Sequence, residues 1–208
     1  ASTSNFPAQS VVALNDGSFV VTFTAGTQVL AQHYAANGSP LGAAIQVSPS
    51  TQTSYGNGTA LALVGGGFLV TYFGNNLEYG QLFNASAVPQ GNPFQIPALT
   101  TVGSRQSFAA LAGGGFVATW SEAANISSPP DGNVLAQRFD ASGNAVGNTF
   151  RINATNPLIA ANSQASSANS QQSTDAGSGV VVTAVMATLP LYPNPSVAGL
   201  SGGGFVAA

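Results

Sequence analysis

One pattern of apolar and polar positions recurs along the chain. In each occurrence an apolar run leads into a short turn, and a second run follows in which large apolar side chains alternate with smaller ones, as is typical of β-strands. The occurrences are VVALNDGSFVVTF at 11–23, ALALVGGGFLVTYF at 60–73, FAALAGGGFVATW at 108–120 and, shortened, VAGLSGGGFVAA at 197–208. The aromatic residue after the turn is Phe19, Phe68, Phe116 and Phe205, with first steps of 49 and 48 residues. This period predicts one folding unit copied in tandem.

The turn inside each occurrence predicts a β-hairpin. Asn, Asp and Gly tolerate the positive φ that tight hairpin turns require. We therefore expect structural turn glycines at Gly17, Gly67, Gly115 and Gly204.

A second hairpin follows the first in three of the copies. Its opening strand is VLAQHY at 29–34, EYGQLF at 78–83 and VLAQRF at 134–139. The distance from the shared glutamine to the return strand is 13 residues each time (Gln32 to Ile45, Gln81 to Phe94, Gln137 to Phe150). Equal spacing indicates that the three second hairpins are equivalent.

Four short strands in about 50 residues match one blade of a β-propeller. We therefore predict an all-β fold of tandem four-stranded antiparallel repeats, arranged as propeller-like blades. A β-solenoid has a compatible period, but its coils run parallel, whereas tight turns join antiparallel strands. The predicted organisation is repeat 1 at 1–59, repeat 2 at 60–107, repeat 3 with an inserted loop at 108–155, and a loop with an incomplete, degenerate repeat at 156–208.

The last part of the chain departs from the pattern. The polar segment Thr155–Ser173 predicts a long loop, and Gly177–Thr183 resembles a degenerate copy of the strand after the turn. Val197–Ala208 supplies a first hairpin without its second. An incomplete unit leaves an unpaired apolar strand edge, and such edges recruit partners. We expect self-association through this segment, with ring closure against the first unit as the alternative.

Charged residues are scarce, at 4% of the chain against about 25% in ordinary domains. The three arginines, Arg105, Arg138 and Arg151, are too few for a phosphate-binding stripe, which excludes nucleic acid as a partner. No apolar run approaches the roughly 18 residues of a membrane helix, so we predict no membrane insertion. Cysteine is absent, which excludes a disulfide scaffold. Residues 1–10 lack the features of a signal peptide, so we expect a removed signal, another export signal, or a longer parent chain.

Two segments resemble a repeat of very large secreted bacterial proteins. FAALAGGGFVATW at 108–120 and VLAQRFDASGNAVGNTFRIN at 134–153 are similar to the patterns SVAALxDGGFVVTW and VxAQRFDAxGxxxGxxFxVN. These patterns belong to calcium-dependent, type I-secreted adhesins and haemolysin-type (RTX-like) surface proteins, and the likeness covers most of 10–155. The resemblance implies an extracellular or cell-surface location and a role as stalk or display. This chain departs from the family in having few aspartates, the residues on which the family's calcium sites depend.

His33 is the only histidine, so a Ser-His-Asp arrangement would have to use it. It takes the position of Leu82 and Arg138 in other copies, which favours a half-exposed strand residue without a catalytic role. A zinc site needs about three or four His, Cys or carboxylate ligands and is excluded by composition.

Asp140, Ser142 and Asn144 place oxygen side chains at alternating positions, as calcium loops do. They are the candidate metal ligands. The same residue types are expected in a hairpin turn, and Ala35 and Asn84 stand where Asp140 does. The turn interpretation is favoured, and we predict no cofactor.

Other candidates have equally plain structural explanations. Glu122 and Asp131 are the carboxylates considered for glycoside hydrolysis, with a chance pair as the favoured interpretation. Phe23, Tyr72 and Trp120 share one repeat position, either as sugar-stacking platforms or, as we favour, as filling between packed sheets. Candidate glycosylation sites in N-x-S/T sequons are Asn37, Asn57, Asn84, Asn125 and Asn153.

The repeats, the small catalytic inventory and the resemblance together predict a non-enzymatic extracellular structural or adhesive protein. It would be part of a cell-surface layer or filament. The alternative is a carbohydrate-binding, propeller-type lectin module, with surface glycans as partners.

Overall fold

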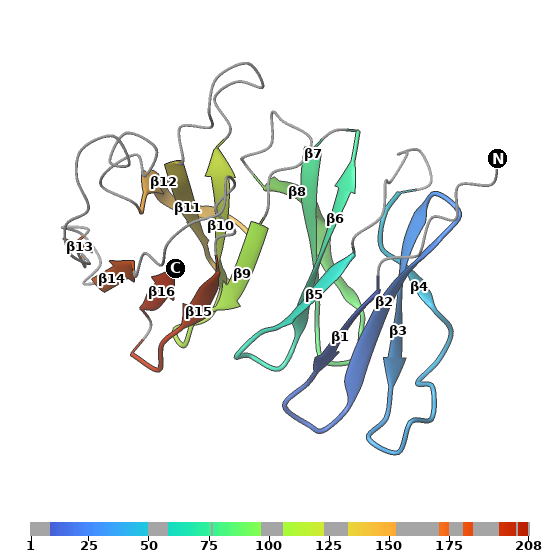
Figure 1. Ribbon diagram of the computed structural model, residues 1–208. Helices are drawn as coiled ribbons and strands as arrows, with labels where there is room; N and C mark the ends of the chain where they lie inside the picture. Colours follow the sequence, from blue (N-terminus) through green and yellow to red (C-terminus); the bar gives the residue numbers. More distant parts are fainter. Residues whose placement is uncertain are drawn as a thin grey trace, which may run out of the picture. The chain divides into compact units, whose positions relative to one another are not determined.

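The computed structural model describes residues 9–49, 58–75, 77–96, 106–122, 133–152, 171–174, 181–184, 196–202 and 204–207. Within these ranges every regular element is a β-strand, and the strands form four sheets of four strands each (Figure 1). The prediction of an all-β chain of tandem four-stranded repeats is confirmed. The chain divides into two compact units, Ala1–Pro97 and Ala98–Ala208, and each unit contains two of the sheets.

The two sheets of the first unit share one design. Strands that follow one another in the chain are neighbours in the sheet, and every pair is antiparallel, because tight turns connect them. The first sheet consists of β1 (Gln9–Ala13), β2 (Phe19–Ala25), β3 (Gln28–Tyr34) and β4 (Ile45–Gln46). The second sheet consists of β5 (Thr59–Ala62), β6 (Phe68–Gly74), β7 (Leu77–Phe83) and β8 (Pro89–Ile96).

The third sheet, in the second unit, repeats this antiparallel order. It consists of β9 (Gln106–Ala110), β10 (Phe116–Glu122), β11 (Asn133–Phe139) and β12 (Ala145–Arg151). The longer link between its two hairpins, residues 123–132, lies outside the described residues.

The fourth sheet differs in connection. It consists of β13 (Gln171–Thr174), β14 (Val181–Ala184), β15 (Val197–Gly199) and β16 (Phe205–Ala207), in the order β13-β14-β16-β15. β15 and β16 form the expected hairpin, but β16 also pairs with β14, and that pair is parallel.

Two expectations for this region are therefore wrong. The strand edge of Val197–Ala208 that was expected to be unpaired is paired within the chain by β14, which comes from the degenerate copy Gly177–Thr183. The segment Thr155–Ser173, expected to be loop, ends in strand β13, while 153–170 lies outside the described residues. Composition alone missed β13, because a polar edge strand lacks an apolar alternation.

Because the sheets are copies of one repeat, each face of one sheet has a counterpart on the others. We call the face that carries the repeat phenylalanine (Phe19, Phe68, Phe116 or Phe205) the front face. The opposite face, which carries the residue that follows this phenylalanine in the chain, is the back face. Successive side chains of a strand point to opposite faces of the sheet, and two residues paired across neighbouring strands share a face. The register of the strand pairs therefore assigns each residue to the front or the back face.

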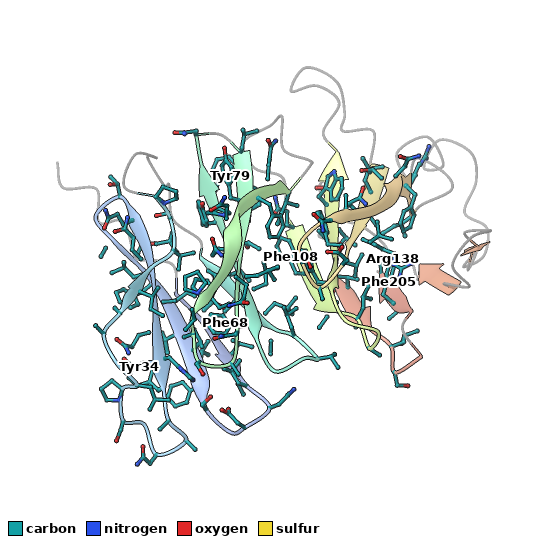
Figure 2. The ribbon with its side chains drawn as sticks, turned by 180° about the vertical axis from the view of Figure 1, so that it is seen from behind. Tyr34, Phe68, Tyr79, Phe108, Arg138 and Phe205 are labelled. Atoms are coloured by element: carbon teal, nitrogen blue, oxygen red, sulfur yellow. The ribbon has the colours of Figure 1, made fainter. Side chains whose placement is uncertain are left out.

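In the first unit, the front face of the second sheet packs on the back face of the first. Phe68 (Figure 2), Val70 and Tyr72 from β6 share one buried cluster with Val20 and Val29 from the first sheet. All five side chains are 0% exposed.

The second unit has the same packing between its own two sheets. Phe205 (Figure 2) and Ala207, on the front face of the fourth sheet, share a cluster with Leu111, Val117 and Ala136 on the back face of the third. These three occupy the repeat positions of Leu14, Val20 and Ala31, which are buried in the first unit's cluster. One sheet-to-sheet interface is therefore built twice in this chain.

Candidate functional site

The side chains of Asp16, Ser18 and His33 meet at the first hairpin of the first sheet. The Ser18 hydroxyl donates a hydrogen bond to Asp16 Oδ1, and the Ser18 backbone N–H donates to the same oxygen at 3.0 Å. His33 Nε2 lies 2.9 Å from Ser18 Oγ. The hydroxyl bond to Ser18 holds the pKa of Asp16 below its usual value. His33 and Ser18 are each only 5% exposed, so the expectation of a half-exposed His33 is wrong.

The direction of these bonds decides what the cluster can do. Because the hydroxyl proton of Ser18 points to Asp16, His33 Nε2 is the donor toward Ser18 Oγ. In a nucleophilic triad the histidine accepts the serine proton and the carboxylate holds the other ring nitrogen. Here the serine stands between the other two groups, so the cluster ties the hairpin turn to β3 and does not activate a nucleophile.

The cluster is specific to the first copy. Gly65 and Gly113 stand at the position of Asp16, Gly67 and Gly115 at that of Ser18, and Leu82 and Arg138 at that of His33. All three polar residues therefore replace the consensus in the same copy, and they bond to one another.

The turns that hold these residues are alike in the first three copies. A β-turn at Leu14–Gly17 is closed by a 3.1 Å bond from Gly17 N to Leu14 O, and Leu14 N donates to Ser18 O at 2.8 Å. The glycine with positive φ in this turn is Gly17 (84°), and its counterparts are Gly66 (89°) and Gly114 (88°). The bulged turn explains why glycine recurs here.

Three of the expected turn glycines lie one residue later, at the position of Ser18. Gly115 also has positive φ, at 74°, and a Cβ there would overlap the carbonyl oxygen of Phe139. A Cβ at Gly67 would overlap the carbonyl oxygen of Phe83, although its φ is not positive. Gly204 accepts the corresponding hydrogen bond from Leu200 N, at 2.8 Å.

The Asp140 loop is a hairpin turn whose oxygens are occupied. Asp140 Oδ1 accepts the N–H groups of Ser142 at 2.8 Å and Asn144 at 2.9 Å, and Oδ2 accepts the Asn144 side-chain amide at 3.0 Å. The bonds from Asn144 hold the pKa of Asp140 below its usual value. Asn84 uses its side-chain oxygen in the same way, toward Ser86 and Val88. Within the described residues no three His, Cys, Asp or Glu side chains gather to hold a metal ion.

The other candidate residues fall as follows. The carboxylates considered for glycoside hydrolysis lie outside the described residues, Asp131 entirely and Glu122 in its side chain. Tyr72 is 0% exposed and Trp120 is 3% exposed, which agrees with side chains that fill the space between packed sheets. Phe23, at the same repeat position, is half-buried. Of the sequons, Asn37 and Asn84 lie exposed in hairpin turns, while Asn57, Asn125 and Asn153 are outside the described ranges.

The shared glutamine of each second hairpin has a structural task that sequence reasoning missed. Gln137 Nε2 donates to the carbonyl oxygens of Arg138 at 2.9 Å, and of Val146 and Gly147 at 3.3 Å. Gln81 and Gln32 make equivalent bonds across their hairpins. In the second and third sheets the strand register shifts at this glutamine. Its amide therefore satisfies carbonyl groups that the bulge removes from the ladder.

Glu78 is an unusual residue for its place in the repeat. It lies on β7 where the other copies have Val29 and Val134, and it is only 7% exposed. Burial raises the pKa of its carboxyl group to about 7. On the opposite face of the same sheet, the Tyr72 hydroxyl is also buried, which raises its pKa to about 12.

Hydrogen bonds of two serines accompany the sheet-to-sheet interface. Ser10 Oγ, on the first sheet, accepts the N–H of Ala60 on the second at 3.3 Å. Ser107 Oγ, on the third sheet, accepts the N–H of Val197 on the fourth at 3.1 Å. Ser10 and Ser107 occupy the same repeat position, as do Ala60 and Val197. We call this bond the serine latch; its sequence signal is the Ser or Thr just before each occurrence of the pattern.

Comparisons with known proteins add little about function. No family model and no curated protein matches the chain. Among solved structures, a protein of unknown function from Bacteroides caccae is similar at 14% sequence identity with a TM-score of 0.44. The match covers 74% of this chain and 50% of that protein, so this chain spans about half of its length. Within the described part of the chain, no helix is long and apolar enough to cross a membrane.

Proposed function

We propose that this chain is a non-enzymatic structural or adhesive repeat protein that acts outside the cell, in a surface layer or filament. The observation that carries the proposal is the sheet-to-sheet interface that the chain builds twice, with the same apolar positions and the same serine latch. Repeats that contact their neighbours through the same interface can stack into extended arrays.

The polar side chains support the same proposal. Two of the candidate clusters are engaged in holding turns: the Ser18 proton bonds to Asp16, and both Asp140 oxygens accept backbone or side-chain N–H groups. The low charge of the chain also favours association, because little electrostatic repulsion opposes it.

The proposal is tested in the source organism and on the purified chain. Antibodies against the chain should label the outside of intact cells by immunogold electron microscopy, and purified protein should form layers or filaments in negative stain. Labelling confined to the cell interior would overturn the extracellular role. Specific binding on a glycan array by a non-assembling protein would favour the lectin alternative.

A further inference from the structure

Two sheet faces that are exposed in this chain have counterparts that are buried inside its units. On the front faces, Phe68 is buried inside the first unit and Phe205 inside the second, each at 0% exposure, but Phe19 of the first sheet is only half-buried. Val11, on this same front face of the first sheet, is 67% exposed. Among the described residues, the front face of the first sheet therefore lacks the cover that the front faces of the second and fourth sheets have.

The back faces show the complementary exception. Val20 and Val117 are each 0% exposed inside their units, but their counterpart Val206 on the fourth sheet is half-buried. Leu200, at the position of the buried Leu14 and Leu111, is 46% exposed.

From these two surfaces we infer that the front face of the first sheet binds the back face of the fourth sheet in a second copy of this chain. The inference deepens the assembly part of the proposed function and rests on it. The occupant is defined by the molecule itself, since in both units the surface that covers a front face is the back face of a like repeat.

The parts needed for this contact are present on both surfaces. Val11 stands where Ala60 and Val197 donate their N–H groups in the serine latch, and Ser196 stands where Ser10 and Ser107 accept them. Ser196 is exposed, so its hydroxyl is available to accept the Val11 N–H of the next copy. Each of these strands, β1 and β15, lies at the edge of its sheet, as the latch requires.

The two faces are also compatible in polarity. On the front face of the first sheet, Ala13, Val21, Phe23 and Leu30 are apolar. The two other neighbours of Phe19 on this face are Tyr34, whose ring stacks on Phe19, and Gln32, whose amide is bonded within its own hairpin. The β15–β16 hairpin carries no charged residue. Two different surfaces that fit each other form a heterologous contact, which propagates head to tail and does not stop at a dimer.

The test uses one exposed residue from each face of the full-length chain. Val11→Asp places a charge on the front face and leaves the back face intact, and Leu200→Asp does the reverse. Val88→Asp is the matched control, because Val88 is 51% exposed in a turn outside both faces. Light scattering and analytical ultracentrifugation measure the size of each protein over a range of concentrations.

The expected results are specific to a heterologous contact. The unaltered chain and Val88→Asp grow with concentration, whereas Val11→Asp and Leu200→Asp each remain monomeric with association weakened at least tenfold. An equimolar mixture of these two variants forms a heterodimer and stops there, because each contributes one intact face. Heterodimer formation also shows that both variants are folded.

Three outcomes would overturn the inference. Growth of both variants like the unaltered chain would show that assembly uses other surfaces, while leaving the assembly part of the proposed function standing. A chain that stays monomeric at every concentration, but is destabilised by each variant, would show that the faces close within one molecule. A monomer insensitive to both variants would show that the faces bind nothing. If the inference holds but immunogold finds the protein inside the cell, the proposed function fails alone.

Discussion

In the hairpin turns, the backbone conformation and the space left by neighbouring backbone atoms decide which residues must be glycine. At Gly115 two requirements coincide, since its φ is 74° and the space for a Cβ is taken by the Phe139 carbonyl. Gly113, two residues earlier in the same turn, has no atom within 4 Å of a Cβ and no positive φ. The two glycines look alike in the sequence, but only one of them is sterically required.

Replacing Gly115 with valine should destabilise the second unit by more than about 3 kcal/mol, because a β-branched residue resists positive φ and the backbone must move. Gly113→Val is the matched control and should change stability by less than about 1 kcal/mol. Denaturant unfolding followed by fluorescence of Trp120, the single tryptophan, measures both. Equal stabilities would contradict the steric argument.

Glu78 gives the first unit a predictable pH dependence. Its pKa is raised from 4.5 to about 7 in the folded state, so the folded protein binds a proton that the unfolded chain releases in this range. Its contribution to stability is therefore complete below pH 4.5 and is lost as the pH rises to about 7. The loss should be about 3 kcal/mol.

Glu78→Gln keeps the shape of the side chain and removes the titration. Its free energy of unfolding should stay nearly constant where that of the unaltered chain falls, as measured by denaturant titrations below pH 4.5 and above pH 7. Parallel pH profiles of the two proteins would show that another group carries the effect.

At the scale of elements, the second hairpin depends on a side chain to complete its hydrogen bonding. The ladder between β11 and β12 shifts register between Ala136 and Arg138, and the Gln137 amide bonds the carbonyl oxygens that face it. Gln137 is 2% exposed, and its bonds to these carbonyl oxygens are partly shielded from water.

Gln137→Leu should therefore cost about 1–3 kcal/mol, since it removes these part-buried bonds and takes away the acceptor of the Thr149 hydroxyl. Gln95→Leu, at an exposed position of β8, should stay within about 0.5 kcal/mol. Hydrogen exchange of the β12 amides provides the local measurement. Unchanged protection of β12 in Gln137→Leu would mean that the amide does not hold the hairpin.

At the scale of the whole molecule, side-chain hydrogen bonds join the first sheet to the segment that enters the second. Thr22 Oγ1 on the first sheet donates to the carbonyl oxygen of Gly58, just before the second sheet begins. The neighbouring threonine on the same strand, Thr24, has a buried hydroxyl with no hydrogen-bond partner among the described residues.

Thr22→Val removes the bond to Gly58 at nearly constant volume and should destabilise the first unit by about 1–2 kcal/mol. Thr24→Val removes an unsatisfied hydroxyl instead and should be neutral or slightly stabilising. Thermal unfolding by circular dichroism compares the two. A Thr24→Val variant as unstable as Thr22→Val would show that loss of the hydroxyl, and not of the inter-repeat bond, is responsible.

The repeat, its four strands and its turns were determined by the sequence alone. Alternation of apolar residues and the backbone freedom of glycine act between near neighbours in the chain, so the run around Phe68 and the turn at Gly17 are visible without a structure.

Only the tertiary structure decided how distant residues combine. His33 is buried on the back face of the first sheet and bonds to Ser18 from the β1–β2 turn, and β16 pairs with β14 across a segment with no periodic signal. The burial of Phe68 and the exposure of Val11 also depend on which sheet lies against each face. Such contacts join residues far apart in the chain, and local pattern carries no information about their pairing.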